Sequence, residues 1–374
     1  MTPRERYIET MKFGTPDKIP FSPGGPREST LKRWRSEGMD DSNQSWWQCV
    51  LDATGVVEDK SDIPRADHGV NFLMEPMFEE KVLEHKDGHY IVQDWKGNVC
   101  EISDEFDVSY LRNAVDFVTR AWIKCPVESH ADWEDMKTRY KLENRYPEDF
   151  DDRVKILKQR DYTTAIGLHG PFWQLREWCG FEGLCMFMVE DPEFVAEMAN
   201  FWMEFVSENL KRVLDAGVID ILFINEDMAY KEKSMISPAM TREFIMPSWT
   251  RWSKEAHDAG VSLIELDSDG KVDELIPLMI ESGVDVNLPI EVAAGNDIVE
   301  YRKMFGKDIA YSGGIDKRCM AKGGQALIDE LARNEPVVRD GGFIPGCDHG
   351  VPHDVSWPNF VQYSRMLAEM TGWI

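Results

Sequence analysis

The chain has 374 residues, with 68 acidic and 42 basic side chains, a formal net charge of −26 and seven cysteines. This charge excludes a nucleic-acid-binding or anionic-membrane-binding protein, because both functions need basic faces. Scattered cysteines in odd number are not a disulfide framework and predict a reducing, cytoplasmic location. The amino terminus has no apolar signal core, and no run of about 18 apolar residues could span a membrane.

Before residue 160 the expected elements are irregular in order. Thr2 can cap a first helix, with Pro3 at its first position. Turn signals at 86–88 and 95–98 separate β-rich runs and predict an antiparallel meander inserted into the chain. The expected elements are a helix at 2–13, a strand at 18–21, a helix at 28–37, the meander at 81–102 and outer helices at 126–160. Segment 40–66 shows no clear pattern.

From residue 163 onward, short apolar strands alternate with helices. This order predicts a parallel sheet covered by helices. No G-x-G-x-x-G follows the first strand and no G-x-x-x-x-G-K-S/T occurs, which favours a barrel over a nucleotide-binding doubly wound sheet. The expected strands are 163–168, 218–224, 261–266, 284–289, 308–311 and 342–344, and the expected helices are 192–214, 241–259, 272–282, 298–305, 325–334 and 359–370.

Polar side chains collect where these strands end, the edge at which α/β barrels carry their chemistry. They are His169, Asn225, Glu226, Asp227, Glu265, Asp267, Asp269, Asp316, Cys347, Asp348 and His349. In so acidic a chain, a single carboxylate is more often a solvated side chain or a helix cap. Acids at four successive strand ends, followed by a cysteine and a histidine, predict a functional site.

The stretch 341–352, GGFIPGCDHGVP, is the most informative of these ends. It breaks a short strand at Pro345 and then presents Cys347, Asp348 and His349 in consecutive positions. A thiol, a carboxylate and an imidazole suit a metal site or an acid–base site. A tight turn with an incidental cysteine and a capping aspartate is the alternative.

Two chemical interpretations fit the whole collection. In the first, Asp267, Asp269 and Cys347 hold a divalent metal, and Glu226, Glu265 or His349 adds a ligand. Residues 267 and 269 are two apart at a strand end and therefore share a face. In the second, no metal binds, and the carboxylates act as general acid and base on an organic substrate. Residue spacing leaves both interpretations open.

The order of several short motifs resembles the uroporphyrinogen decarboxylase superfamily. The matching segments are 17–20 (DKIP), 169–172 (HGPF), 236–247 after Glu226 and Asp227, 267–270 (DSDG), 283–287 (GVDVN), 312–316 (SGGID) and 342–352, with Asn359 and Tyr363. The resemblance implies one (β/α)8 TIM barrel domain over residues 1–374, with the β-hairpin insertion at about residues 80–102. It also implies an active site in a cleft at the carboxyl end of the barrel.

That superfamily holds two main chemistries. Its decarboxylases bind a polyanionic porphyrinogen with an arginine-rich loop, whereas segment 22–27 here has a single arginine, Arg27. The other branch consists of zinc-dependent methyltransferases that work with a corrinoid protein. Their His-x-Cys motif corresponds to Asp267-Ser-Asp269 here, and their late cysteine corresponds to Cys347. The chain is therefore most similar to the methyltransferase components of O-demethylase systems.

The resemblance implies an enzyme that moves a methyl group from a small methylated donor, such as a methoxylated aromatic, to the cobalt of a corrinoid (cobalamin) on a partner protein. Zn²⁺ held by Asp267, Asp269 and Cys347 would activate the leaving oxygen. Glu226 and His349 are the expected catalytic residues; the expected substrate-binding residues are His169, Phe172, Trp173 and Asn225. A metal-independent decarboxylase that uses the strand-end carboxylates is the alternative, and a homodimer is the candidate assembly.

Overall fold

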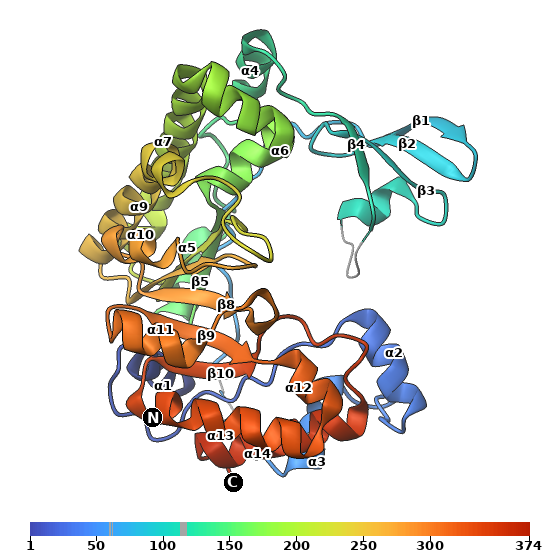
Figure 1. The fold of residues 1–374 in the computed structure, drawn as a ribbon. Helices are drawn as coiled ribbons and strands as arrows, with labels where there is room; N and C mark the ends of the chain where they lie inside the picture. The colour runs from blue at the N-terminus through green and yellow to red at the C-terminus, as the bar shows by residue number, and fades with distance from the viewer. Residues whose placement is uncertain (60, 62, 113–117) are drawn as a thin grey trace.

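The computed structural model describes residues 1–59, 61, 63–112 and 118–374 (Figure 1). The strands are β1 (Lys81–Lys86), β2 (His89–Gln93), β3 (Val99–Ser103), β4 (Ala121–Lys124), β5 (Ala165–His169), β6 (Ile221–Asn225), β7 (Leu263–Asp267), β8 (Val286–Ile290), β9 (Ala310–Ile315) and β10 (Phe343–Cys347). The helices before β7 are α1 (Pro3–Met11), α2 (Glu28–Ser36), α3 (Trp46–Thr54), α4 (His130–Lys137), α5 (Phe150–Leu157), α6 (Pro171–Glu190), α7 (Pro192–Ala216), α8 (Pro238–Met240) and α9 (Met246–Asp258). Those after β7 are α10 (Ile276–Glu281), α11 (Ile298–Phe305), α12 (Lys317–Lys322), α13 (Gly324–Asp340) and α14 (Trp357–Thr371).

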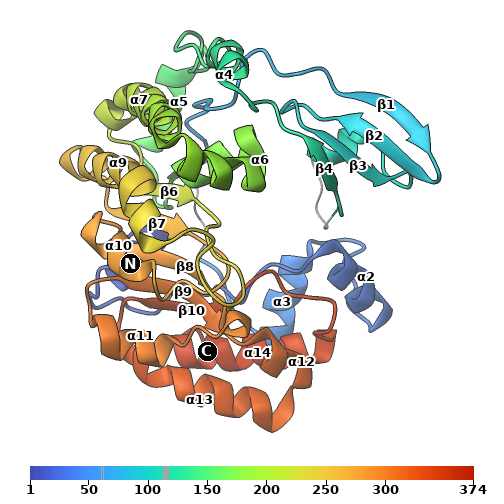
Figure 2. The ribbon, with the colours of Figure 1, turned by 45° about the horizontal axis from the view of Figure 1, so that its top comes forward.

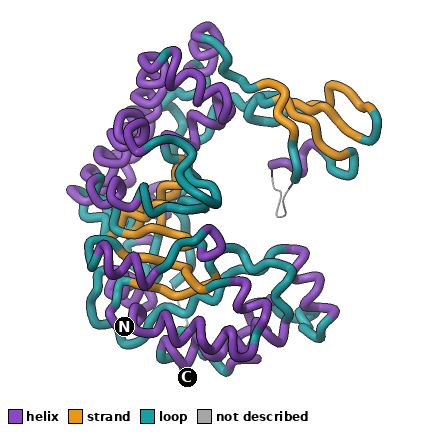
Figure 3. The backbone as a smooth tube through the Cα atoms, viewed as in Figure 1, coloured by secondary structure: helices purple, strands orange, loops and turns teal. Residues whose placement is uncertain are grey.

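A parallel sheet of six strands, in the order β10-β9-β8-β7-β6-β5, forms the centre of the fold. Every neighbouring pair in it is parallel, and helices cover its outer side (Figure 3). Because each crossover returns the chain to the same end, all six strands finish at one edge. The predicted α/β barrel architecture and the six strands expected after residue 163 are confirmed.

Hydrogen bonds do not close this sheet into a ring within the described residues. Extended segments lie at both edges instead. Beside β5, the imidazole of His68 contacts the carbonyl oxygen of Ala165 at 3.1 Å. Beside β10, Pro26 and Val351 form an isolated parallel bridge.

The prediction of a strand at 18–21 is wrong, because this segment pairs with no other strand. Pro20 has no N–H to donate to a ladder. The N–H of Ile19 bonds the carbonyl of Thr371, at the end of α14, at 3.0 Å. Segment 18–21 is therefore held by the end of helix α14 and by loop contacts, not by a neighbouring strand.

The predicted meander is confirmed, with β4 as an additional strand in the order β1-β2-β3-β4. It has its own small core of Val92, Cys100, Ile102 and Leu111. Figures 1 and 2 show it projecting away from the parallel sheet, on the side toward which the strands of that sheet point.

Four helices, α3, α6, α8 and α12, have no counterpart among the sequence-based expectations. Helix α3 falls in the segment that showed no pattern. Helix α6 follows β5 directly, and its apolar residues are not confined to one buried stripe, because Phe181, Met186 and Val189 are exposed. Residues 241–245 form a π-helical turn before α9, where one continuous helix was expected.

The inner face of the sheet meets α1. Met11 of α1 packs with one residue from each of five strands, Ile221, Leu263, Val286, Ala310 and Ile344. The hydroxyl of Tyr7 on the same helix donates to Glu265 Oε1 at 2.7 Å. The interior is thus filled below the strand ends, and only their carboxyl edge is open. Within the described residues, no helix combines the length and the apolar character needed to cross a lipid bilayer.

Candidate active site

An open pocket of about 450 Å³ lies at the carboxyl ends of β6, β7, β8 and β10. Its lining combines acids, an imidazole, a thiol and an indole. The lining residues are Gly25, Trp173, Asn225, Asp227, Asp267, Asp269, Leu288, Pro289, Cys347, His349 and Gly350. We call this cavity the strand-end pocket. It unites six of the nine residues that the sequence assigns to a site.

Strand register explains why Asn225 and Asp267 meet. They are paired across β6 and β7, so their side chains lie on the same face of the sheet. The Asn225 amide Nδ2 donates to Asp267 Oδ1 at 2.7 Å. Asp267 is half-buried at the floor of the pocket.

The pKa of Asp267 is raised to about 7. Burial is the largest cause, followed by the charges of Asp269 and Asp227, and the hydrogen bond from Asn225 acts in the opposite direction. A carboxyl group with this pKa carries a proton in a substantial fraction of molecules at neutral pH. Asp267 can therefore serve as a general acid.

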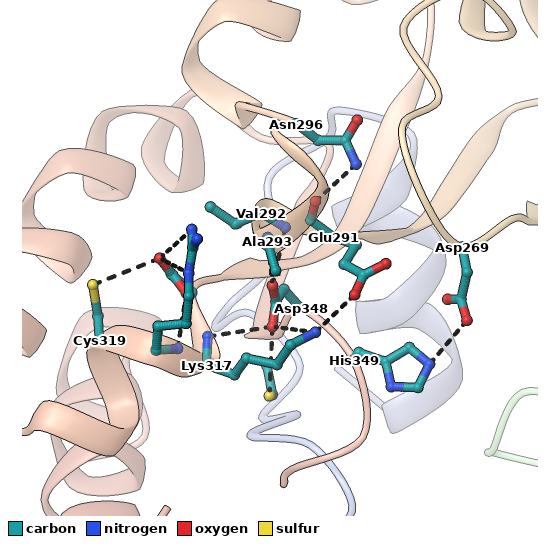
Figure 4. Close-up of polar contacts among 12 residues, drawn as sticks. Asp269, Glu291, Val292, Ala293, Asn296, Lys317, Cys319, Asp348 and His349 are labelled. Carbon is teal, nitrogen blue, oxygen red and sulfur yellow. Dashed lines mark hydrogen bonds and ion pairs between the residues drawn. The ribbon is translucent and has the colours of Figure 1, made fainter. Parts of the chain in front are cut away.

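Asp269 and His349 form a second polar pair on the wall of the pocket (Figure 4). His349 Nε2 lies 3.0 Å from Asp269 Oδ2, and the hydrogen bond with Asp269 raises the pKa of His349. Nδ1 lies 3.4 Å from Nη2 of Arg27. Because a guanidinium only donates, this contact assigns Nδ1 as the acceptor and Nε2–H as the donor to Asp269. Protonation of His349 would break the contact with Arg27.

Asp348 anchors the loop that carries His349. Its side chain is fully buried and accepts from the N–H groups of Val292, Ala293 and Lys317, at 3.0, 3.3 and 3.2 Å. The Lys317 ammonium lies 3.6 Å from Asp348 and 2.9 Å from Glu291. Figure 4 shows these contacts joining the loops after β8, β9 and β10. Asp348 therefore positions its neighbours and faces no substrate.

Glu226 lies behind the pocket. It follows Asn225 and points to the opposite face, where Trp249 Nε1 donates to it at 2.5 Å and the N–H of Trp173 donates at 3.0 Å. Burial raises its pKa to about 8. Glu226 fixes the start of α6, and so the place of Trp173 on the pocket wall.

The family model for uroporphyrinogen decarboxylase (URO-D) matches residues 114–367. The chain belongs to the uroporphyrinogen decarboxylase family. No curated protein matches it. A solved structure described as a methyltransferase from Methanosarcina mazei is 13% identical, covers 99% of this chain and 98% of its own, and superimposes with a TM-score of 0.57, which indicates a shared fold.

A B12-independent methionine synthase from Shewanella sp. W3-18-1, in complex with selenomethionine, is a more distant structural match. It is 14% identical and covers 59% of this chain and 65% of its own. Its TM-score of 0.36 is too low to indicate a shared fold over the whole chain. The resemblance to the uroporphyrinogen decarboxylase superfamily that the motifs suggest is confirmed by the family match.

The zinc site expected in this member of the uroporphyrinogen decarboxylase family does not fit the side chains as they are placed. Within the part of the chain that the structure describes, no three His, Cys, Asp or Glu side chains converge as metal ligands. Burial raises the pKa of Cys347 to about 12, so its thiol keeps the proton that a metal would have to displace. The zinc site expected at Asp267, Asp269 and Cys347 therefore has no geometric support among the described residues.

Two other predicted residues lie outside the strand-end pocket. Phe172 is fully buried in the main core and does not line the pocket. His169 ends β5 and lines a separate cavity. The rings of His169 and Trp173 are 5.4 Å apart, and Trp173 lines the strand-end pocket while His169 lines the other cavity.

Sequence reasoning assigned no role to Asp227, which lines the pocket with a positive φ of 53°. This left-handed conformation is tolerated by aspartate and is enriched at functional sites. Nη2 of Arg176 lies 3.7 Å from its carboxylate. Burial, and then Asp269, raises the pKa of Asp227. The run Asn225-Glu226-Asp227 at the end of a strand could have indicated this role. Alternation along a strand places the first and third residues of such a run on the same face.

Proposed function

We propose that this enzyme transfers a methyl group from a small methylated donor, a methoxylated aromatic, to the cobalt of a corrinoid carried by a partner protein. The observation that carries the proposal is the protonatable Asp267 on the floor of an open pocket. Family membership and the shared fold with a methyltransferase support it. The corrinoid supplies the nucleophile.

The difficult part of such a reaction is the leaving group, because an ether would release a basic alkoxide or phenolate. A proton from Asp267 at the ether oxygen turns the leaving group into a neutral alcohol or phenol. The amide of Asn225 holds the Asp267 carboxyl in place at 2.7 Å. Proton transfer from Asp267 needs no metal. This agrees with the described residues, in which no three His, Cys, Asp or Glu side chains converge as metal ligands.

The remaining groups orient the donor. The indole of Trp173 offers an apolar wall, against which an aromatic ring can stack. The Asp269 carboxylate, held by His349, adds a polar acceptor to the lining of the pocket. Pro289 and Leu288 add apolar lining, and the pocket is open enough for a partner protein to reach it.

The charge of the pocket argues against the decarboxylase alternative. Three carboxyl groups, from Asp227, Asp267 and Asp269, line it. The charges of Asp227 and Asp269 already raise the pKa of Asp267, so a polyanionic substrate would meet the same repulsion. A neutral ether avoids this cost.

The test is to mix the purified protein with cob(I)alamin and a panel of methoxylated aromatics and methylamines. Methyl transfer appears as the spectrum of methyl-Co(III). We expect turnover with a methoxylated aromatic, loss of turnover in Asp267→Asn, and full turnover in Asp354→Asn, which alters an exposed carboxylate. No spectral change with any donor would contradict the proposal, and release of CO2 from a porphyrinogen would favour the decarboxylase.

A further inference from the structure

A second cavity, of about 240 Å³, lies beside the end of β5 and shares no lining residue with the strand-end pocket. We call it the β5 cavity. Its walls combine five aromatic side chains with aliphatic and polar ones. The aromatic residues are Phe72, Trp95, Tyr140, Trp178 and Trp202, and His169 is the titratable group at the strand end.

The hydrogen-bond network around His169 fixes what its imidazole offers. Tyr140 Oη accepts from Trp178 Nε1 at 3.1 Å and from Gln174 Nε2 at 3.3 Å. The Gln174 amide therefore turns its Oε1 toward His169 Nδ1, 3.3 Å away. Nδ1 must carry the hydrogen of that bond, which leaves Nε2 with a lone pair.

Nε2 has no hydrogen-bond partner among the residues that the structure describes. Burial lowers the pKa of His169, so the ring stays neutral and Nε2 remains an acceptor. The carbonyl of His169 accepts from Trp202 Nε1 at 2.9 Å, which holds the backbone in place. His169 thus offers a fixed neutral acceptor to a cavity that is partly lined by aromatic rings.

The size and charge of the cavity narrow the ligand class. A dry protein cavity of about 150 Å³ accommodates benzene, so this one has room for a substituted benzene ring. Aromatic walls favour stacking or edge-to-face contact with such a ring. Lys96 and Glu177 also line the cavity and form an ion pair with each other, which leaves no net charge to attract an ion.

We propose that the β5 cavity binds a small neutral phenol, whose hydroxyl group donates a hydrogen bond to His169 Nε2. The site would be separate from the strand-end pocket. A phenol is also what demethylation of a methoxylated aromatic releases, but binding in this cavity does not rest on the proposed reaction. The experiment below measures no methyl transfer, so either idea can fail alone.

The test is calorimetric titration of the wild-type protein with phenol and with toluene, which has a similar shape but no hydroxyl donor. One added hydrogen bond predicts tighter binding of phenol by several-fold to about tenfold. In His169→Phe, toluene should still bind and the preference for phenol should vanish. In Asp269→Asn, which alters the other pocket, the preference should persist.

Equal affinities for phenol and toluene in the wild type would overturn the proposal. So would a preference that survives in His169→Phe, or one that disappears in Asp269→Asn. If His169→Phe does not fold, nitrogen NMR of the wild type decides: the Nε2 resonance of His169 should shift with saturating phenol and not with toluene. An unmoved resonance would also reject the site.

Discussion

Asn225 and Asp267 are joined by a 2.7 Å hydrogen bond across two neighbouring parallel strands. The pair unites a group that cannot titrate with one whose pKa is raised to about 7. Because an amide donor stabilises the charged carboxylate, Asn225 limits how far burial raises this pKa. The two side chains should therefore be tested together.

The first prediction concerns the pH dependence of methyl transfer. A raised pKa means that Asp267 holds its proton below about pH 7 and loses it above, so the rate should fall as pH rises through that value. Asp267→Asn should lower the rate at pH 6 by about 100-fold or more and remove this limb. A pH–rate profile of both proteins measures the effect. A wild-type rate that stays flat from pH 6 to 8.5 would exclude this role for Asp267.

The second prediction concerns Asn225. Asn225→Leu keeps a similar volume but removes the donor, so the pKa of Asp267 should rise further. The falling limb of the pH–rate profile should then move to higher pH. A limb that moves to lower pH, or stays in place, would show that the hydrogen bond does not control the acid.

The third prediction concerns metal content. Because no three ligands converge in the described residues, protein dialysed against a chelator should retain methyl transfer. Elemental analysis should find no stoichiometric zinc, and Cys347→Ser should not change the metal content. Stoichiometric zinc that disappears in Cys347→Ser together with activity would restore the metal interpretation.

The fourth prediction concerns Asp348. Asp348→Ala would leave the partly buried N–H groups of Val292, Ala293 and Lys317 without their acceptor, while the Lys317 ammonium would keep Glu291 as its partner. The free energy of unfolding should fall by about 3–5 kcal/mol, because each unpaired donor costs about 1–3 kcal/mol. Urea denaturation measures this loss. Asp354→Ala, at an exposed carboxylate on the same loop, should stay within about 0.5 kcal/mol of the wild type.

The fifth prediction concerns Gly170. A Cβ atom there would lie 2.0 Å from the Glu226 carboxyl carbon, so Gly170→Ala should destabilise the fold by about 3 kcal/mol or more. Glu226→Ala alone should cost about 1–3 kcal/mol, because it leaves two donors unpaired. The double variant should be more stable than the sum of both losses predicts, since the clash is gone. Strict additivity in denaturation experiments would argue against this contact.

The strand-and-helix alternation after residue 163 was enough to predict the sheet, because buried parallel strands are continuous apolar runs bounded by turns. Segment 18–21 looked like a strand for the same reason. What separates it is the partner of Ile19, a helix end more than 300 residues away in sequence. No local pattern carries that information.

The candidate site was predictable in part. Alternation along a strand explains why Asp267 and Asp269 could be grouped, and strand-end position explains why Cys347 and His349 joined them. Glu226 looked equivalent to its neighbours, but its direction depends on where the preceding strand ends. His169 does not line the strand-end pocket, because the ring of Trp173 packs against it. This contact depends on how α6 packs, which the local sequence does not indicate.

The contact between Asp269 and His349 spans 80 residues of sequence. During synthesis the ribosome releases Asp227, Asp267 and Asp269 well before the strand that brings His349. A nascent chain can therefore form the β5–β7 part of the sheet while the pocket still lacks one wall. Ligand binding at the strand-end pocket would therefore show that β10 has joined the sheet. An NMR signal from the imidazole of His349 would distinguish complete chains from truncated ones.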